Sequence, residues 1–178
     1  RDFISLSGAL NRVLAETIRS DEFVPVFNRS TVDGYAVISS DVFGCSDSIP
    51  AVLNLVGESQ MGAHADFDLQ PGQCAAVPTG GEVPDGADAV VMVEHTESLG
   101  GGQVAIYKPV APGVNMIIRG EDTKPGDVVL PAGRRINAAD TGTLAALGVT
   151  RIPVMKRPRV AILSTGDELI TPAQKPSP

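Results

Sequence analysis

Residues 28–37 form the stretch Asn28-Arg29-Ser30-Thr31-Val32-Asp33-Gly34-Tyr35-Ala36-Val37, on which the predicted fold depends. Within it lie a cluster of hydroxyls, one carboxylate, an Asp-Gly pair and an aromatic ring. Asp-Gly between apolar residues is a strong signal for a β-hairpin, because glycine adopts positive φ without steric cost. The pattern therefore predicts a hairpin turn at Asp33-Gly34. In this interpretation Asp33 serves the turn alone, and only further motifs would give its carboxylate a function.

Glycine and proline divide the rest of the chain into short segments. The 178 residues include 19 Gly and 14 Pro, which leaves little room for long helices. Short apolar runs alternate with Gly/Pro/Asp clusters, a pattern typical of strands joined by tight turns. Three glycines at residues 100–102 predict a hairpin tip. The predicted strands are residues 35–39, 51–56, 74–77, 89–94, 103–107 and 127–130.

Two segments have the apolar spacing of a helix. The second covers residues 138–147, where Asn137 and Asp140 form a carboxylate variant of the capping box and Gly148 supplies a left-handed stop. The first follows Ser5 or Ser7. Its apolar positions are Leu6, Ala9, Leu10, Val13, Leu14 and Ile18.

The end of the chain differs in character from the β-rich part. Residues 151–155 predict a strand, and residues 156–159 form a short basic joint. Residues 160–163 are continuously apolar, which predicts a strand buried on both faces of a parallel sheet. No further strand follows to pair with it. We therefore expect the chain to be the front part of a longer protein, ending just inside an α/β domain.

Composition excludes several classes of function. A net charge of −7 argues against non-specific nucleic-acid binding, which requires clustered Lys and Arg. Cys45 and Cys74 are the only cysteines and lack partners at metal-ligand spacing, so a zinc site is not expected. One disulfide is conceivable, but two free thiols in a reducing cytoplasm are the simpler expectation. No apolar run approaches the roughly 18 residues of a membrane span. The N-terminus lacks a signal-peptide pattern, so a cytoplasmic protein is the default.

Four polar clusters could carry chemistry. Besides residues 30–35, residues 78–88 join the Thr79 hydroxyl to glycines whose backbone can face a ligand. In residues 113–126, Arg119 could pair with an oxyanion and Asp122 could hold a cation. Residues 164–168 follow a strand, where ligands bind in open α/β sheets. Each cluster also has a simpler interpretation, as turns, as a solvated charge pair or as carboxylates that complement a helix dipole.

These clusters match four ordered sequence patterns. Residues 27–36 match Phe-Asp-x-Ser-x-x-Asp-Gly-Tyr-Ala except that Asn28 replaces Asp, and residues 79–91 match Thr-Gly-x-x-x-Pro-x-Gly-Ala-Asp-Ala-Val-Val. Residues 113–122 match Gly-x-Asn followed by Gly-Glu-Asp, and residues 164–169 match Ser-Thr-Gly-Asp-Glu-Leu. The chain thereby resembles the N-terminal region of the molybdopterin molybdotransferases, the MoeA and gephyrin E-domain family. It also departs from some members at residues 116–118, where Met-Ile-Ile replaces a more basic segment.

The resemblance implies a mixed α+β, β-rich fold. An elongated, partly helical linker domain would comprise residues 1–34 and 127–157, with two helices. A β-rich domain would be inserted at residues 35–126. Residues 158–178 would begin a truncated α/β domain similar to molybdopterin-binding domains.

The resemblance also implies a reaction. Members of the family transfer molybdenum from molybdate to adenylylated molybdopterin, with Mg²⁺ as a cofactor and AMP as a product. Homodimers are the family rule, and the cleft lies between the α/β domain of one subunit and the β-rich module of the other. A molybdopterin adenylyltransferase is a further expected partner, whereas nucleic acid and membrane are not. The chain alone is expected to be inactive.

Family positions map onto this sequence residue by residue. The expected catalytic residues are Asp33, Thr79, Asp122 and Glu168. The expected substrate-binding residues are Ser30, Gly80, Arg119, Thr165, Gly166 and Asp167. Asp122 and Glu168 are also the expected Mg²⁺ ligands, because hard cations prefer carboxylate oxygens. The alternatives are a non-catalytic interaction or scaffold module of the same fold, and a generic β-rich ligand-binding domain.

Overall fold

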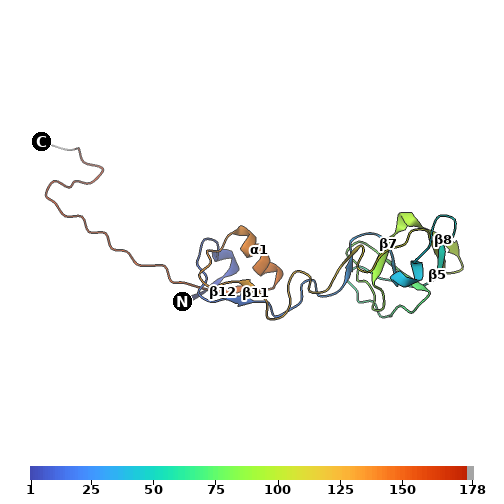
Figure 1. Cartoon of the computed structure of the whole chain (residues 1–178). Coiled ribbons are helices and arrows are strands. Elements are labelled where there is room, and N and C mark those ends of the chain that lie inside the picture. Colours follow the sequence, from blue (N-terminus) through green and yellow to red (C-terminus); the bar gives the residue numbers. More distant parts are fainter. Residues whose placement is uncertain (176–178) are drawn as a thin grey trace.

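A computed structural model describes residues 1–175 of the chain. Figure 1 shows a β-rich body at one end and a small module that contains the only α-helix of the described residues, α1 (Ala138–Ala146). Two extended segments of the backbone connect the body to this module. An extended C-terminal segment leaves the module on the opposite side and ends far from the body. No helix among residues 1–175 has the length and apolarity needed to cross a membrane.

The β-rich body is a six-stranded sheet with the strand order β7-β4-β6-β5-β9-β8. Its strands are β4 (Gly34–Val37), β5 (Ala51–Glu58), β6 (Gln73–Val77), β7 (Ala89–Met92), β8 (Thr96–Gly100) and β9 (Gln103–Ile106). Only β5 and β6 pair in parallel. Five of these strands were predicted from the sequence. The sixth, β8, contains Glu, Ser and Gly and lacks a strand pattern.

The predicted hairpin tip at residues 100–102 is confirmed. Strands β8 and β9 pair in an antiparallel manner around it, and all three glycines have positive φ.

The sheet packs on a core of small aliphatic side chains with two buried free thiols, Cys45 and Cys74. Burial raises the pKa of Cys74 to about 11, which makes this thiol inert at neutral pH.

The small module has its own core, formed by residues from both ends of the chain. Strand β1 (Asp2–Ser5) pairs with β12 (Arg151–Val154), and β2 (Ile18–Arg19) pairs with β11 (Val128–Leu130). The helix α1 confirms the second predicted helix. Its buried residues are Asp140 and Leu144, and the rest of the core is Ala9, Leu14, Ile18, Leu130, Ile136, Ile152 and Val154.

The capping box of α1 is present as predicted. The side chain of Asn137 accepts a hydrogen bond from the Asp140 N–H at 2.9 Å, and the Asp140 carboxylate accepts one from the Asn137 N–H at 2.9 Å. Arg134 also donates to both oxygens of this carboxylate, at 2.9–3.1 Å. Together, these bonds keep the pKa of the buried Asp140 below its ordinary value, with Arg134 as the main cause. Gly148 ends the helix with φ of 68°.

The first predicted helix is wrong. Only residues Leu6–Gly8 form a single 3₁₀ turn, and Asn11 then takes φ of 64°. Beyond that point the backbone bonds across the module instead of along a helix. The Leu14 N–H donates to the Arg134 carbonyl at 2.9 Å, and the Ala15 N–H donates to the Pro153 carbonyl at 2.9 Å. Of the apolar residues of this segment, Ala9, Leu14 and Ile18 are buried, Leu6 and Val13 are partly buried, and Leu10 is 51% exposed.

Two segments of the chain, residues 20–28 and residues 118–127, join the β-rich body to the small module, and we call them the connector. Strand β3 (Arg29–Ser30) pairs with β10 (Met116–Ile117) where the chain enters and leaves the β-rich body. Two further 3₁₀ turns, Ser39–Val42 and Val93–His95, follow β4 and β7 within the body. The domain limits expected from the sequence stay a prediction.

The apolar stretch at residues 160–163 forms no strand. Val160, Ile162 and Leu163 are 78%, 88% and 89% exposed. Its expected burial needs neighbouring strands, and no other segment of residues 1–175 pairs with it. The stretch therefore lies extended in the C-terminal segment.

The predicted hairpin at Asp33-Gly34 is also wrong. Gly34 is the first residue of β4 and is absent from the positive-φ glycines of the chain. Strand β4 pairs with β6 on one side and with β7 on the other. A Cβ atom at Gly34 would overlap the carbonyl oxygen of Val91 in β7. Glycine is therefore required here for close backbone approach rather than for a turn.

Replacing Gly34 by alanine should destabilise the β-rich body. We expect the free energy of unfolding to fall by more than about 3 kcal/mol, because the overlapping atom belongs to backbone and cannot move without disrupting the sheet. Chemical denaturation of the 178-residue chain measures this change.

The matched control is Gly142→Ala in α1, where no atom beyond its chain neighbours and the backbone of its own helix lies within 4 Å of the added Cβ. This variant should be more stable by up to about 1 kcal/mol, because alanine has the higher helix propensity. A Gly34→Ala chain within about 0.5 kcal/mol of the wild type would contradict the close approach of β4 to β7.

Candidate functional site

The contact between Asp33 and Thr79 is the centre of the candidate site. Gly34 lies opposite Val77 in the β4–β6 register, so Asp33 precedes β4 at the same end where the chain leaves β6. The Asp33 Oδ1 atom accepts a hydrogen bond from the Thr79 N–H at 2.7 Å and another from the Thr79 hydroxyl at 2.9 Å. Two of the predicted catalytic residues therefore touch, although 46 residues separate them in the sequence.

The Asp33 carboxylate is exposed and stays ionised. The Thr79 N–H, and then the Thr79 hydroxyl, hold the pKa of Asp33 below its ordinary value of 3.8. Both donors bond Oδ1, and within residues 1–175 the second oxygen, Oδ2, has no hydrogen-bond partner. The carboxylate is thus fixed by one oxygen and presents the other to solvent.

A clamped turn carries Thr79. The Gly80 N–H donates to the Ser30 carbonyl at 2.8 Å, and the Ser30 N–H donates to the Gly81 carbonyl at 3.0 Å. Gly80 has φ of 82°, a conformation that favours glycine. The predicted substrate residues Ser30 and Gly80 therefore come together beside Thr79 and Asp33.

Ser30 itself has a structural part in this turn. It is only 2% exposed, and its hydroxyl donates to the Val32 carbonyl and accepts from the Val32 N–H at 3.2 Å. This short loop sets the path of the chain into Asp33. A direct contact of the Ser30 hydroxyl with substrate stays a prediction.

Arg119 lies on the connector, beside the clamped turn. The Arg119 guanidinium stacks over the Phe23 ring, 4.2 Å from the centroid. The backbone N–H of Arg119 donates to the Asn28 side-chain oxygen at 2.9 Å. No carboxylate of residues 1–175 forms a salt bridge with this guanidinium. Arg119 therefore remains an uncompensated cation that aromatic stacking holds in place.

Asp122 is separated from Asp33. It lines a hollow of about 670 Å³ between the connector and the C-terminal end of α1, together with Val24, Val128 and Leu147. This hollow faces the small module, whereas Asp33 lies at the edge of the β-rich body. Asp122 thus joins neither Asp33 nor Thr79 within the described chain.

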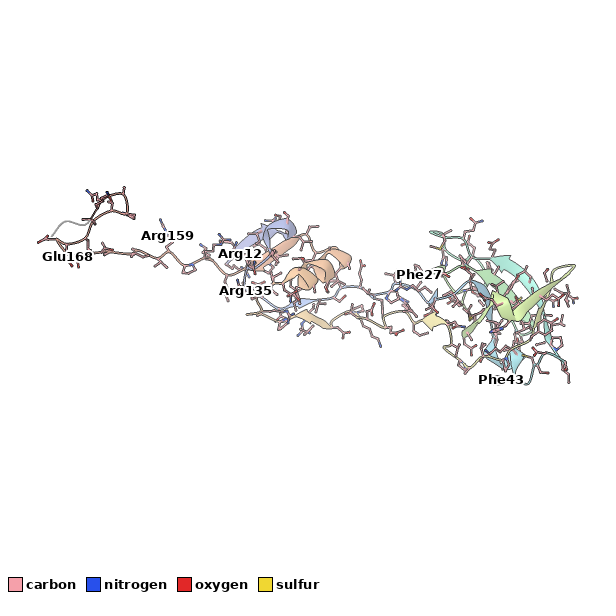
Figure 2. All side chains as sticks on the ribbon, turned by 90° about the horizontal axis from the view of Figure 1, so that it is seen from above. Arg12, Phe27, Phe43, Arg135, Arg159 and Glu168 are labelled. Carbon is pink, nitrogen blue, oxygen red and sulfur yellow. The ribbon has the colours of Figure 1, made fainter. Side chains whose placement is uncertain are left out.

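The remaining predicted residues lie in the C-terminal segment. Thr165, Gly166, Asp167 and Glu168 are all exposed. Figure 2 shows Glu168 at the far end of this segment, with the small module between it and Phe27, which lies near the β-rich body. The four residues therefore do not meet Asp33 within one chain.

The residues present do not fit Mg²⁺ by themselves. Asp122 and Glu168, the predicted ligands, lie in different parts of the molecule. Residues 1–175 hold no group of three or more His, Cys, Asp or Glu side chains that could bind a metal ion. Mg²⁺ usually binds through one or two carboxylates together with substrate phosphates, so a site with one of these carboxylates would also need the substrate.

Sequence reasoning missed one polar contact near the site. The Glu82 Oε2 atom bonds the His64 Nδ1 atom at 2.8 Å and accepts the Ala65 N–H at 2.9 Å. The motifs of the sequence do not include His64 and assign it no role. Eighteen residues and strand β6 separate the pair, so no local pattern could have indicated it.

Comparison with known proteins gives consistent results. Residues 1–148 match the family described as "MoeA N-terminal region (domain I and II)". A molybdopterin molybdenumtransferase of Bacillus subtilis is 36% identical over 172 residues, covering 95% of this chain and 40% of the relative. A putative molybdopterin biosynthesis protein of Methanocaldococcus jannaschii is 41% identical over 168 residues, covering 94% of this chain and 39% of the relative.

A solved structure agrees with this similarity. The crystal structure of the molybdopterin biosynthesis MoeA protein from Pyrococcus horikoshii superposes with a TM-score of 0.87 at 38% identity, covering 97% of this chain and 46% of that one. The chain spans about 40% of the length of the curated relatives. The match over residues 1–148 covers most of the sequence and both bodies of the fold. The chain therefore belongs to the MoeA family, whose N-terminal domains I and II it matches.

Proposed function

We propose that this chain forms one wall of the active site of a molybdopterin molybdenumtransferase. The reaction would transfer molybdenum from molybdate to adenylylated molybdopterin and release AMP. Membership of the MoeA family and the names of its relatives support an involvement in molybdenum cofactor biosynthesis. The observation that carries the proposal is the exposed Asp33 carboxylate, oriented through one oxygen by Thr79.

The chemistry of Asp33 favours an orienting role. Molybdate and the phosphates of the substrate are anions, which a bare carboxylate repels. A carboxylate with a lowered pKa is also a weak base, so it is poorly suited to removing a proton. Its free oxygen can instead accept a hydrogen bond from a water molecule. Asp33 would thus position a water beside the transferred oxyanion, with Thr79 fixing the carboxylate.

The second wall would come from another chain. In the proposed homodimer, Thr165, Gly166, Asp167 and Glu168 of one copy would face Asp33 of the other. Asp122 and Glu168 do not meet within one chain, so Mg²⁺ would be held by them only if the partner copy brought them together, and it would then offset the negative charge of the substrates. The chain alone would be inactive, and a molybdopterin adenylyltransferase would supply the adenylylated substrate.

The pKa of Asp33 tests the proposed fixation by Thr79. In Thr79→Val, the hydroxyl donor is lost but the backbone N–H remains. We expect the pKa of Asp33 to rise and yet stay below 3.8, because the N–H is the larger of the two causes. The carbon-13 shift of the Asp33 carboxyl group, followed against pH, measures this value.

Thr96→Val is the matched control for this titration. It removes a hydroxyl that donates to the Val93 carbonyl at 2.8 Å and touches no carboxylate. The pKa of Asp33 should be the same in this control as in the wild type. An Asp33 pKa that does not change in Thr79→Val would show that the hydroxyl does not bond the carboxylate.

The function itself is tested in a complete enzyme. This chain can replace the matching region of the Bacillus subtilis relative, and molybdenum cofactor formation by the chimera can be measured. We expect Asp33→Ala to reduce it by roughly 100-fold or more, as for the loss of an oriented polar group at a reacting centre. The fold should be retained because Asp33 is exposed, with at most a small fall in the melting temperature from the loss of its two hydrogen bonds to Thr79.

Asp47→Ala serves as the control, because Asp47 is an exposed carboxylate of the same body, away from Thr79. This variant should form cofactor at the wild-type rate. Undiminished cofactor formation in Asp33→Ala would overturn the role of Asp33, whereas a chimera that forms no cofactor with Asp33 intact would favour the alternative function, a non-catalytic interaction module.

A further inference from the structure

A second hollow lies beside the Asp33–Thr79 contact and has no assigned role. It measures about 570 Å³ and opens between the start of the β-rich body and the connector. Its wall includes Gly80 and Gly81, the two residues that follow Thr79. Arg119 from the connector also lines it, together with a titratable side chain, His64, from the loop between β5 and β6. We call this hollow the Arg119–His64 pocket.

We propose that the Arg119–His64 pocket binds a tetrahedral oxyanion of charge −2, with Arg119 and protonated His64 as its two cations. The oxyanion would be free or carried as a phosphate ester. This inference rests on the proposed function, because it assigns the anionic part of the substrate to a pocket next to Asp33 and Thr79. It adds a residue, His64, that the sequence patterns do not include.

Arg119 is held ready for such a ligand. Its guanidinium stacks on Phe23 instead of pairing with a carboxylate, and its backbone N–H is anchored by Asn28. The planar donors of a guanidinium match an oxyanion well. Asn28 replaces the Asp of the family pattern, so this wall of the pocket carries one negative charge fewer.

Glu82 positions His64 on the opposite wall. Its Oε2 atom bonds both the His64 ring and the Ala65 N–H, at 2.8 Å and 2.9 Å. Between residues 60 and 66 these are the described hydrogen bonds that join the loop to another part of the chain. The Glu82 side chain is 15% exposed, whereas His64 is 75% exposed. Glu82 is therefore a positioning residue, and His64 keeps its other ring nitrogen for a ligand.

The charges around His64 make binding dependent on pH. Hydrogen bonding to Glu82 raises the pKa of His64 above its ordinary value of 6.5, and the nearby Asp66 and Asp85 add to this. At high pH, when His64 is neutral, the pocket contains one positive group, Arg119, and two negative groups, Glu82 and Asp85, so it repels an anion. Protonation of His64 balances these charges and adds a donor. Binding should therefore be strong below the raised pKa and weak above it.

Sulfate is a suitable probe, because it remains a dianion at every pH at which binding to the pocket is to be measured. We would titrate sodium sulfate into the 178-residue chain and follow the amide NMR signals of Gly80 and Gly81, with sodium chloride at equal ionic strength as the blank. We expect saturable binding that weakens about tenfold between about pH 5.5 and about pH 8.5, the effect of losing one charge-assisted hydrogen bond.

Variants of the two histidines test whether His64 causes the pH dependence of sulfate binding. In His64→Gln the side chain can still bond Glu82 but cannot become charged, so sulfate binding should be weak and independent of pH. His95→Gln is the matched control, because His95 lies in a separate hollow beside Lys108 and should leave the wild-type pH dependence intact. Arg119→Gln should abolish binding at both pH values.

The proposal is overturned if the wild type shows no saturable response to sulfate, or if His64→Gln keeps the full pH dependence. AMP, titrated beside sulfate at about pH 7, where most of its phosphate is a dianion and part of His64 is still protonated, separates the two sources of the ligand. Equal affinity for AMP and sulfate supports a free oxyanion, and tighter binding of AMP supports a phosphate ester. These assays measure binding without turnover, so their outcome is independent of the Asp33→Ala test of function.

Discussion

The register of β4 between β6 and β7 is the constraint on which the candidate site depends. Gly34 lies opposite Val77 in one neighbour and opposite Met92 in the other, and it must lack a Cβ atom to do so. This register brings the end of β6 to the start of β4. Asp33 and Thr79 then meet without any need for proximity in the sequence. A shift by one residue would turn each side chain of β4 to the opposite face and separate the two.

The same junction explains the distribution of polar groups around the site. Ser30 turns its hydroxyl into the backbone and shapes the loop, whereas Asp33 projects outward with a free oxygen. The clamped turn that carries Thr79 continues to Glu82, which holds His64 in place. One short segment, residues 79–82, therefore organises both the carboxylate and the neighbouring pocket. The acidic groups Asp122 and Glu168 lie elsewhere and would complete a site only in a larger assembly.

Local signals in the sequence predicted much of this fold but not its long-range contacts. The box of Asn137 and Asp140 lies within four residues, so its helix was predictable. The spacing of Ala9, Leu14 and Ile18 also fits a helix, yet their segment pairs with distant backbone and places these residues in the core of the small module. Gly34 follows Asp as in a turn, but its role depends on Val91 in another strand. The motifs identified Asp33 and Thr79, whereas the His64–Glu82 contact left no pattern.

The hydrogen bond from Thr79 to Asp33 can be observed directly by NMR. A scalar coupling across this bond links the Thr79 amide nitrogen to the Asp33 carboxyl carbon, and it is detectable in the isotope-labelled 178-residue chain. If the register of β4 sets the site, this coupling is present and the pKa of Asp33 lies below 3.8. A missing coupling together with an Asp33 pKa at its ordinary value would contradict the account.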